Sequence, residues 1–223
     1  MSHSITSRKD LLMSSLQSFF DKTENIIKII SVINNNRKIS LRVIDWFVTN
    51  YSKKCNASYI INNNTNKLIL DKADYDPACC SEFVVYLNYK LQLKAYSKGQ
   101  FDPFCRRSRL DFHYNKDKIL NYIEENNLTM PDIVEFLEEN TGGYITTTSG
   151  QLNFFRWIIK KNIIEYITTN ITEIEEDMNT CYKKHYKKKS KNNKSSRKKR
   201  HELSVSASKS LSKSNVKVIL TFN

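Results

Sequence analysis

Eleven basic side chains between Tyr182 and His201 have the residue types and spacing that bind phosphate. They are Lys183, Lys184, Lys187, Lys188, Lys189, Lys191, Lys194, Arg197, Lys198, Lys199 and Arg200. Lysine and arginine neutralise phosphates and release the counterions condensed on nucleic acid, which requires neither a fixed structure nor a base sequence. We therefore predict that this run binds DNA or RNA non-specifically, by charge.

The same composition is compatible with other roles. The sequence RKKR at 197–200 is typical of a nuclear-import signal, and the whole run suits attachment to acidic lipid or acidic protein. Serines at 190, 195, 196 and between 204 and 214 would reduce its charge if they were phosphorylated. A solubilising linker without a partner is the remaining interpretation.

Charge divides the chain into two parts. Residues 183–223 hold 14 Lys and Arg against one acid, Glu202, and so account for the whole net charge of +13. Residues 1–182 hold 22 basic and 22 acidic side chains. The basic run has too few apolar residues to offset the entropy of ordering its backbone. We predict a globular, mainly helical domain at 1–182 and a disordered Lys/Arg/Ser-rich tail at 183–223.

Cys105 is the one residue whose neighbours suggest covalent catalysis. It precedes Arg106 and Arg107, and nearby cations lower the pKa of a thiol. A phosphatase-type loop would need an arginine six residues after the cysteine, but Asp111 occupies that position. We therefore expect no catalytic residue, and an enzyme that uses Cys105 is kept as an alternative.

The arginines after Cys105 have a second interpretation. Arg106, Arg107 and Arg109 are expected either to pair with the surplus acids of residues 124–139 or to form a secondary phosphate contact beside the two phenylalanines of the FDPF turn at 101–104.

Motifs for metals and cofactors are missing from the sequence, so neither is expected. Cys79, Cys80, Cys105 and His113 include no pair with the usual spacing of zinc ligands. The glycines at 142, 143 and 150 match neither a dinucleotide-binding fingerprint nor a phosphate-binding loop. Five cysteines without a repeated spacing favour a reducing compartment, and no apolar run is long enough for a membrane span.

Only four Gly and three Pro interrupt the chain, which favours helices. Helical spacing of apolar residues predicts helices at 10–33 (one broken helix or two), 40–51, 116–126, 132–140, 149–168 and 171–182. A hairpin is expected at 59–61 and 68–70, within a loop insertion near 55–82, and a short strand at 110–114. Residues 83–98 fit both periods, and we interpret them as a helix.

The segment 149–168 has the clearest helical pattern. Thr148 stands at its start with Gln151 three residues later, which is the spacing of a capping box. Apolar residues occur nearly all round the helix, so we expect it to lie in the middle of the core. The fold class is therefore α+β, mainly α with a small β element.

Three sequence blocks resemble an uncharacterised protein family of large nucleocytoplasmic DNA viruses, mimivirus-like members included. They are KISLRVIDWFVTNY at 38–51, KAYSK at 94–98 with FDPFCRR at 101–107, and TTT at 146–148 with GQLNFFRW at 150–157. The resemblance implies a viral protein that is made in the host cytoplasm, at the virus factory. It is compatible with packaging in the virion. It implies no activity and no catalytic residues, and it leaves the basic tail outside.

We therefore predict a non-enzymatic viral protein, associated with nucleic acid or with the virion through Lys183–Arg200. A capsid or scaffold module that binds another viral protein is the first alternative, and an enzyme is the second. Import into the nucleus through residues 197–200 is a further expectation for its location.

Overall fold

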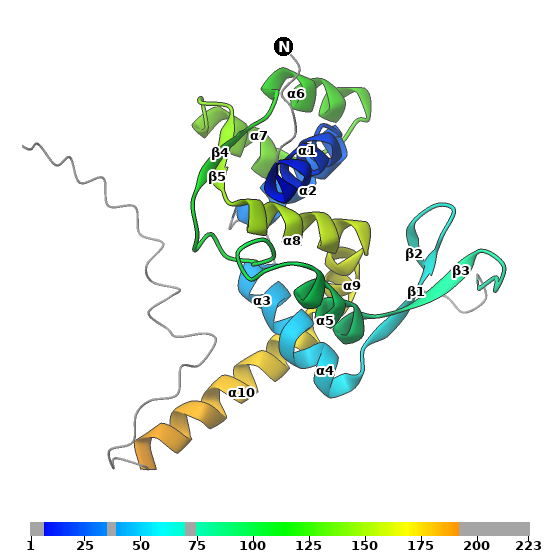
Figure 1. The fold of residues 1–223 in the computed structure, drawn as a ribbon, viewed down its shortest axis with the longest axis vertical. Coiled ribbons are helices and arrows are strands. Elements are labelled where there is room, and N and C mark those ends of the chain that lie inside the picture. The colour runs from blue at the N-terminus through cyan, green and yellow to red at the C-terminus, as the bar shows by residue number, and fades with distance from the viewer. Residues whose placement is uncertain (1–6, 35–38, 70–74, 192–223) are drawn as a thin grey trace, which may run out of the picture. The chain divides into compact units, whose positions relative to one another are not determined.

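A computed structural model describes residues 7–34, 39–69 and 75–191 of the chain. These residues form helices around a common core together with two small antiparallel sheets (Figure 1), which confirms the predicted fold class. The elements are α1 (Arg8–Phe20), α2 (Thr23–Ile33), α3 (Leu41–Trp46), η1 (Phe47–Tyr51), α4 (Ser52–Cys55), β1 (Ser58–Asn62), β2 (Lys67–Ile69), β3 (Cys80–Val84), α5 (Val85–Ala95), β4 (Leu110–His113), α6 (Lys116–Glu125), α7 (Pro131–Glu139), β5 (Tyr144–Thr147), α8 (Ser149–Lys160), α9 (Ile163–Thr169) and α10 (Ile171–Lys191).

The first helical segment consists of two helices with a corner between them. Ser7 caps α1, because its Oγ accepts a hydrogen bond from the backbone N–H of Asp10 at 3.2 Å. At the corner, Asn25 Nδ2 donates to the carbonyl oxygen of Phe19 at 2.8 Å. This confirms the predicted interruption near residues 21–23.

The predicted helix from Ser40 is present but not uniform. Ser40 Oγ accepts from the backbone N–H of Val43 at 3.3 Å, as expected of an N-cap. The chain then widens into the π-helical turn η1 before α4. Ile44, Phe47 and Val48 are fully buried, so this wider turn packs into the core.

The hairpin of β1 and β2 belongs to a three-stranded sheet in the order β2-β1-β3. The register pairs Ile60 with Ile69 across the hairpin and Tyr59 with Phe83 on the other side. Residues 80–82, predicted as part of a loop insertion, and residues 83–84, predicted as the start of a helix, are therefore a strand. The helix α5 follows directly, which confirms the helical interpretation of most of 83–98.

The predicted strand at 110–114 has a partner that the sequence did not indicate. It forms β4, which pairs with β5, and Phe112 lies opposite Ile145. Gly143 adopts a left-handed φ of 62° and its carbonyl oxygen accepts from the N–H of Tyr114 at 2.9 Å, which closes the ladder.

Helix α8 is the centre of the core, as predicted. Thr148 Oγ1 accepts from the N–H of Gln151 at 3.1 Å, and the side chains of Phe154, Phe155 and Ile158 are fully buried. The predicted single helix at 149–168 is wrong in one respect, because it breaks after Lys160. Asn162 has a left-handed φ of 53°, and α9 starts after it in a new direction.

Contacts within the chain define two units, Met1–Tyr182 and Lys183–Asn223. Helix α10 extends to Lys191, so residues 183–191 are helical although the sequence analysis assigned them to the disordered tail. Lysine is a good helix former, and extending an existing helix avoids the cost of nucleation. The remaining tail residues, 192–223, lie outside the described residues.

Candidate nucleic-acid-binding surfaces

The first half of α10 is fixed to the domain by apolar and polar contacts. Ile174 and Met178 are buried in the core. Asp177 accepts a hydrogen bond from Trp46 Nε1 at 3.1 Å and forms an ion pair with Lys54. The helix that leads into the basic run therefore starts from a firmly packed position.

The basic run itself is described only in part. Lys183 and Lys184 are exposed side chains of α10. The next four positions, Lys187, Lys188, Lys189 and Lys191, belong to the same helix by their backbone. Lys194, Arg197, Lys198, Lys199 and Arg200 lie outside the described residues.

Arg106, proposed as a secondary phosphate contact, is engaged in an ion pair. Its Nε donates to Asp102 Oδ2 at 3.1 Å and its Nη2 to Asp102 Oδ1 at 2.8 Å. The guanidinium also lies 5.0 Å from the ring centroid of Phe104. The acid that pairs with Arg106 is thus four residues before it, and not one of those at 124–139.

The turn that carries Arg106 is held against the start of α8. Gln151 Nε2 donates to the carbonyl oxygen of Pro103 at 3.0 Å, and Asn153 Nδ2 to that of Gln100 at 2.8 Å. Arg107 and Arg109 are exposed beside this turn. Of these two arginines, Arg109 also lies near the Cys105 thiol.

Cys105 lies half-buried in the same turn. Burial raises the pKa of its thiol, and the nearby Arg109 guanidinium opposes this shift only in part. An activated nucleophile needs the opposite direction, because the thiolate is the reactive form. The geometry therefore gives the enzyme alternative no support at this residue.

The other cysteines do not form a metal site in the part of the chain that the structure describes, where no group of three His, Cys, Asp or Glu side chains could hold an ion. The Sγ atoms of Cys79 and Cys80 lie 3.7 Å apart, next to Asp76. His113 packs beside the ring of Tyr144 on the β4–β5 sheet. Within the described residues, no helix is both long and apolar enough to cross a membrane.

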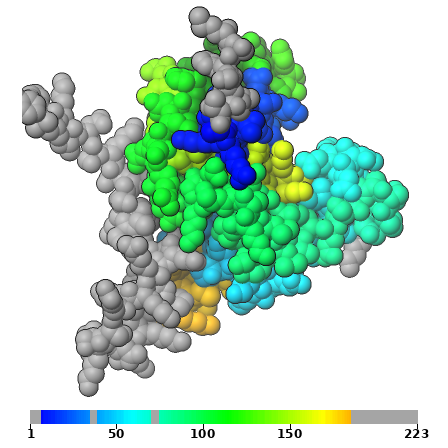
Figure 2. Space-filling model, viewed as in Figure 1, coloured from blue at the N-terminus to red at the C-terminus, as the bar shows by residue number. Residues whose placement is uncertain are grey.

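A basic hollow that the sequence analysis missed lies where the α1–α2 corner, the end of α8 and the β1–β2 turn meet. It has a volume of about 1060 Å³, and we call it the lysine groove because Lys22, Lys28, Lys67 and Lys160 line it. In Figure 2 the yellow end of α8 reaches the surface between the blue N-terminal helices and the cyan hairpin. No local pattern could reveal this site, since its lysines are far apart in the sequence.

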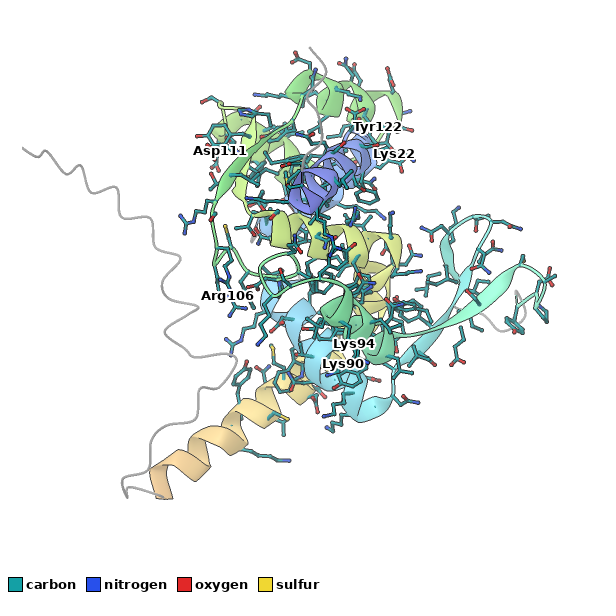
Figure 3. The ribbon with its side chains drawn as sticks, in the orientation of Figure 1. Lys22, Lys90, Lys94, Arg106, Asp111 and Tyr122 are labelled. Atoms are coloured by element: carbon teal, nitrogen blue, oxygen red, sulfur yellow. The ribbon has the colours of Figure 1, made fainter. Side chains whose placement is uncertain are left out.

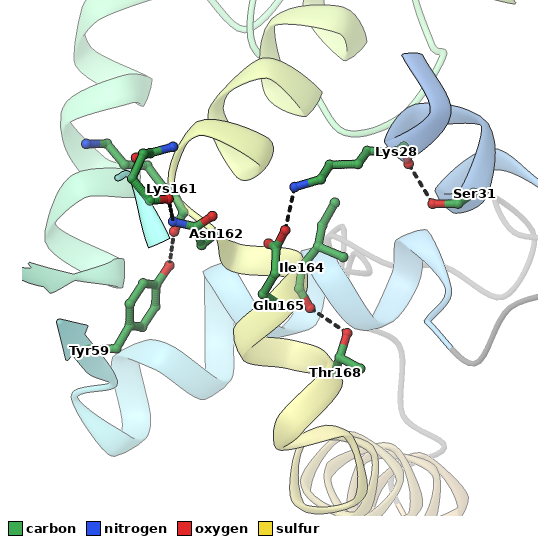
Figure 4. Close-up of polar contacts among 9 residues, drawn as sticks. Lys28, Ser31, Tyr59, Lys161, Asn162, Ile164, Glu165 and Thr168 are labelled. Carbon is green, nitrogen blue, oxygen red and sulfur yellow. Dashed lines mark hydrogen bonds and ion pairs between the residues drawn. The ribbon is translucent and has the colours of Figure 1, made fainter. Parts of the chain in front are cut away.

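The hairpin is held at the groove by the break between α8 and α9. Tyr59 OH donates to the carbonyl oxygen of Lys161 at 2.5 Å, and Asn162 Nδ2 donates to that of Asn66 at 2.8 Å. The first bond satisfies a backbone carbonyl at the end of α8, and the second uses the side chain of the residue at the break (Figure 4). The break after Lys160 therefore provides the groups that hold the β1–β2 hairpin against the helix.

Electrostatics in the lysine groove are dominated by cations. Burial lowers the pKa of Lys160, and the nearby charges of Arg156, Lys161 and Lys22 lower it further. Lys28 differs from these residues, because its Nζ lies 2.6 Å from Glu165 Oε1 (Figure 4).

The profile of a family of unknown function, DUF7197, matches residues 3–130 and 132–222. The chain is similar to the uncharacterized protein L507 of Acanthamoeba polyphaga mimivirus, with 35% identity over 179 residues. The aligned region covers 80% of this chain and 56% of the relative, so the chain spans little more than half of that relative's length. No solved structure matches.

Proposed function

The chain belongs to the DUF7197 family of unknown function, and we propose that this viral protein associates with nucleic acid, without catalysis, through the cations of Lys183–Arg200. The family match and the mimivirus relative confirm the resemblance to a giant-virus family without an established activity. The expectation that the basic tail lies outside this resemblance is wrong, because the family match extends over residues 132–222.

The observation that carries the proposal is the separation of charge along the chain. The domain at 1–182 is neutral, whereas the 41 residues after it hold 14 cations and one acid. A neutral body has little attraction of its own for a polyanion, so the tail supplies the long-range attraction and most of the counterion release.

The helical start of the tail supports the same partner. On a helix with 3.6 residues per turn, the Cα positions of five lysines fall within an arc of about 140°. These are Lys183, Lys184, Lys187, Lys188 and Lys191 of α10. Lysines at these backbone positions suit a partner with regularly spaced phosphates.

The test compares the full chain with residues 1–182 for binding to labelled DNA and RNA across a salt series. If all eleven cations engage duplex DNA, the slope of log K against log salt approaches about −10 for the full chain. The truncated chain is expected to lose most of this slope and of the affinity. Its thermal unfolding should be unchanged, because every buried apolar side chain among the described residues precedes residue 183.

A full-length variant with the eleven basic residues replaced by Gln separates charge from length. It is expected to bind as weakly as the truncated chain. Equal affinity and slope for the truncated and full-length proteins would refute the proposal. Cross-links from the tail to protein alone, inside purified particles, would instead favour the capsid or scaffold alternative.

A further inference from the structure

We propose that the lysine groove is a second binding site for the sugar-phosphate backbone of nucleic acid, on the folded domain itself. The inference rests on the proposed function, because the tail would bring the strand to the domain that the groove then contacts. The tail indicates nucleic acid as the partner by its charge alone, whereas the groove would be a binding site with defined residues.

Three of the four lysines that line the groove have no carboxylate partner among the described residues, and only Lys28 is paired, with Glu165. Lys160 feels the positive charge of Lys22 in the groove and of Arg156 and Lys161 beside it, and within the described residues none of these four forms an ion pair with an acid. Like charges that are brought together and partly desolvated destabilise a fold unless a counterion compensates them. The arrangement is therefore what a site for an anion requires.

Neutral contacts hold these cations in place. Arg156 donates to Ser15 Oγ at 2.8 Å and to Asn153 Oδ1 at 2.6 Å. Lys160 Nζ lies 5.3 Å from the centroid of the Phe19 ring, a cation–π contact. These contacts orient the side chains without cancelling their charge, so the positive potential of the groove is retained.

Two acids, Glu24 and Glu165, also line the groove, where the four lysines outnumber them. Glu165 forms the ion pair with Lys28, and Glu24 Oε1 accepts from Tyr122 OH at 3.0 Å. Lys67 of β2 is exposed on the opposite side of the groove and has no ion-pair partner among the described residues. Unpaired positive charge thus faces the hollow from the helices and from the hairpin.

The shape and lining favour a chain of phosphates over a single one. The groove is open and, at about 1060 Å³, lies at the upper end of the range of about 300–1,000 Å³ that is usual for a small-molecule pocket, so it has room for several linked phosphates. Hydroxyl groups of Ser15, Ser18 and Thr65 line it, and Phe19 contributes an aromatic ring. A basic groove with hydroxyl donors and an aromatic side chain is the usual composition of a surface for single-stranded nucleic acid.

The test uses the full-length chain and two matched double variants, Lys22→Gln/Lys160→Gln in the groove and Lys90→Gln/Lys94→Gln on α5. Both pairs are exposed and each removes two positive charges, but Figure 3 shows the α5 pair on a helix away from Lys22. Affinity for labelled single-stranded and duplex oligonucleotides is measured across a salt series, with an acidic polypeptide as a third ligand.

Loss of two phosphate contacts makes the salt slope shallower by about 1.8 on duplex DNA and about 1.4 on a single strand. At about 0.15 M salt this corresponds to affinity lower by about 30-fold or about 14-fold, respectively. The α5 variant is expected to bind like the wild-type protein, apart from a small change through overall charge. Equal effects of the two variants, or a groove effect seen only with the acidic polypeptide, would overturn the proposal.

Lysine footprinting gives an independent measurement on the unmodified protein. Bound oligonucleotide is expected to slow acetylation of Lys22, Lys67 and Lys160, while Lys90 and Lys94 keep their rates. Uniform rates with and without oligonucleotide would also count against the groove. The proposal for the tail is tested separately, by the nucleic-acid binding of residues 1–182. Either proposal can therefore fail without the other.

Discussion

Substitution of Gly150 by alanine should destabilise the domain, although alanine is the better helix former. Gly150 is the second residue of α8, where the chain passes close to the turn before Arg106. A Cβ at this position would lie 2.8 Å from the carbonyl oxygen of Gly99 and 3.4 Å from the carbonyl carbon of Gln100. These atoms belong to the backbone, so no side-chain rotation can relieve the overlap.

The turn that would have to move is held by three hydrogen bonds. The N–H of Asp102 donates to the carbonyl oxygen of Gly150 at 3.2 Å, and the side chains of Gln151 and Asn153 hold Pro103 and Gln100. Overpacking costs about 1–3 kcal/mol, and each weakened hydrogen bond adds up to about 1 kcal/mol. Alanine regains at most about 1 kcal/mol of helix propensity. The net loss should therefore be about 2 kcal/mol.

Urea unfolding followed by circular dichroism measures this effect. With a slope of about 2 kcal/mol per M, the midpoint of Gly150→Ala should fall by about 1 M. Gly99→Ala is the matched control, because a Cβ there meets nothing closer than Ser97 Oγ at 3.9 Å, and its midpoint should stay close to that of the wild-type protein. A midpoint for Gly150→Ala at or above the wild-type value would refute the steric argument.

Two further predictions concern side chains with perturbed surroundings. Because burial raises the pKa of Cys105, its thiol stays protonated to a higher pH than that of an ordinary cysteine. Alkylation of Cys105 by iodoacetamide at neutral pH should therefore be slower than alkylation of the exposed Cys55. Faster alkylation of Cys105 would reopen the enzyme alternative. Tyr59→Phe removes the hydrogen bond to the carbonyl oxygen of Lys161 and leaves this partly buried acceptor without its donor. The free energy of unfolding should therefore fall by about 1–2 kcal/mol. An unchanged urea midpoint would show that water replaces the hydroxyl.

Features that depend on neighbouring residues could be predicted from the sequence. The caps at Ser40 and Thr148 and the buried helix α8 follow from residue types three or four positions apart. Side chains at these spacings meet on a helix whatever the rest of the chain does. Residues 83–98 were harder, because two periods overlap there. The helical interpretation was correct for α5 (Val85–Ala95) but wrong for Phe83 and Val84, which belong to β3.

Features that depend on distant residues could not be predicted. Strand β5 was missed because its partner β4 is more than thirty residues away, and β3 because β1 supplies its ladder. The break at Asn162 has the same origin. An asparagine adopts the left-handed conformation at little cost, but it is the docked β1–β2 turn, some hundred residues earlier, that bonds to the broken helix.

The sequence by itself determined the division into a neutral domain and a cationic tail, because charge depends on composition and needs no fold. It also determined the central helix, whose pattern is local. Only the tertiary structure decided which cations are free and which are neutralised. Arg106, adjacent to another arginine in the sequence, is paired with Asp102, whereas Lys22, Lys67 and Lys160, far from one another in the sequence, face one groove. The reason is that electrostatic interaction depends on distance in space, which the packing of helices and hairpin sets.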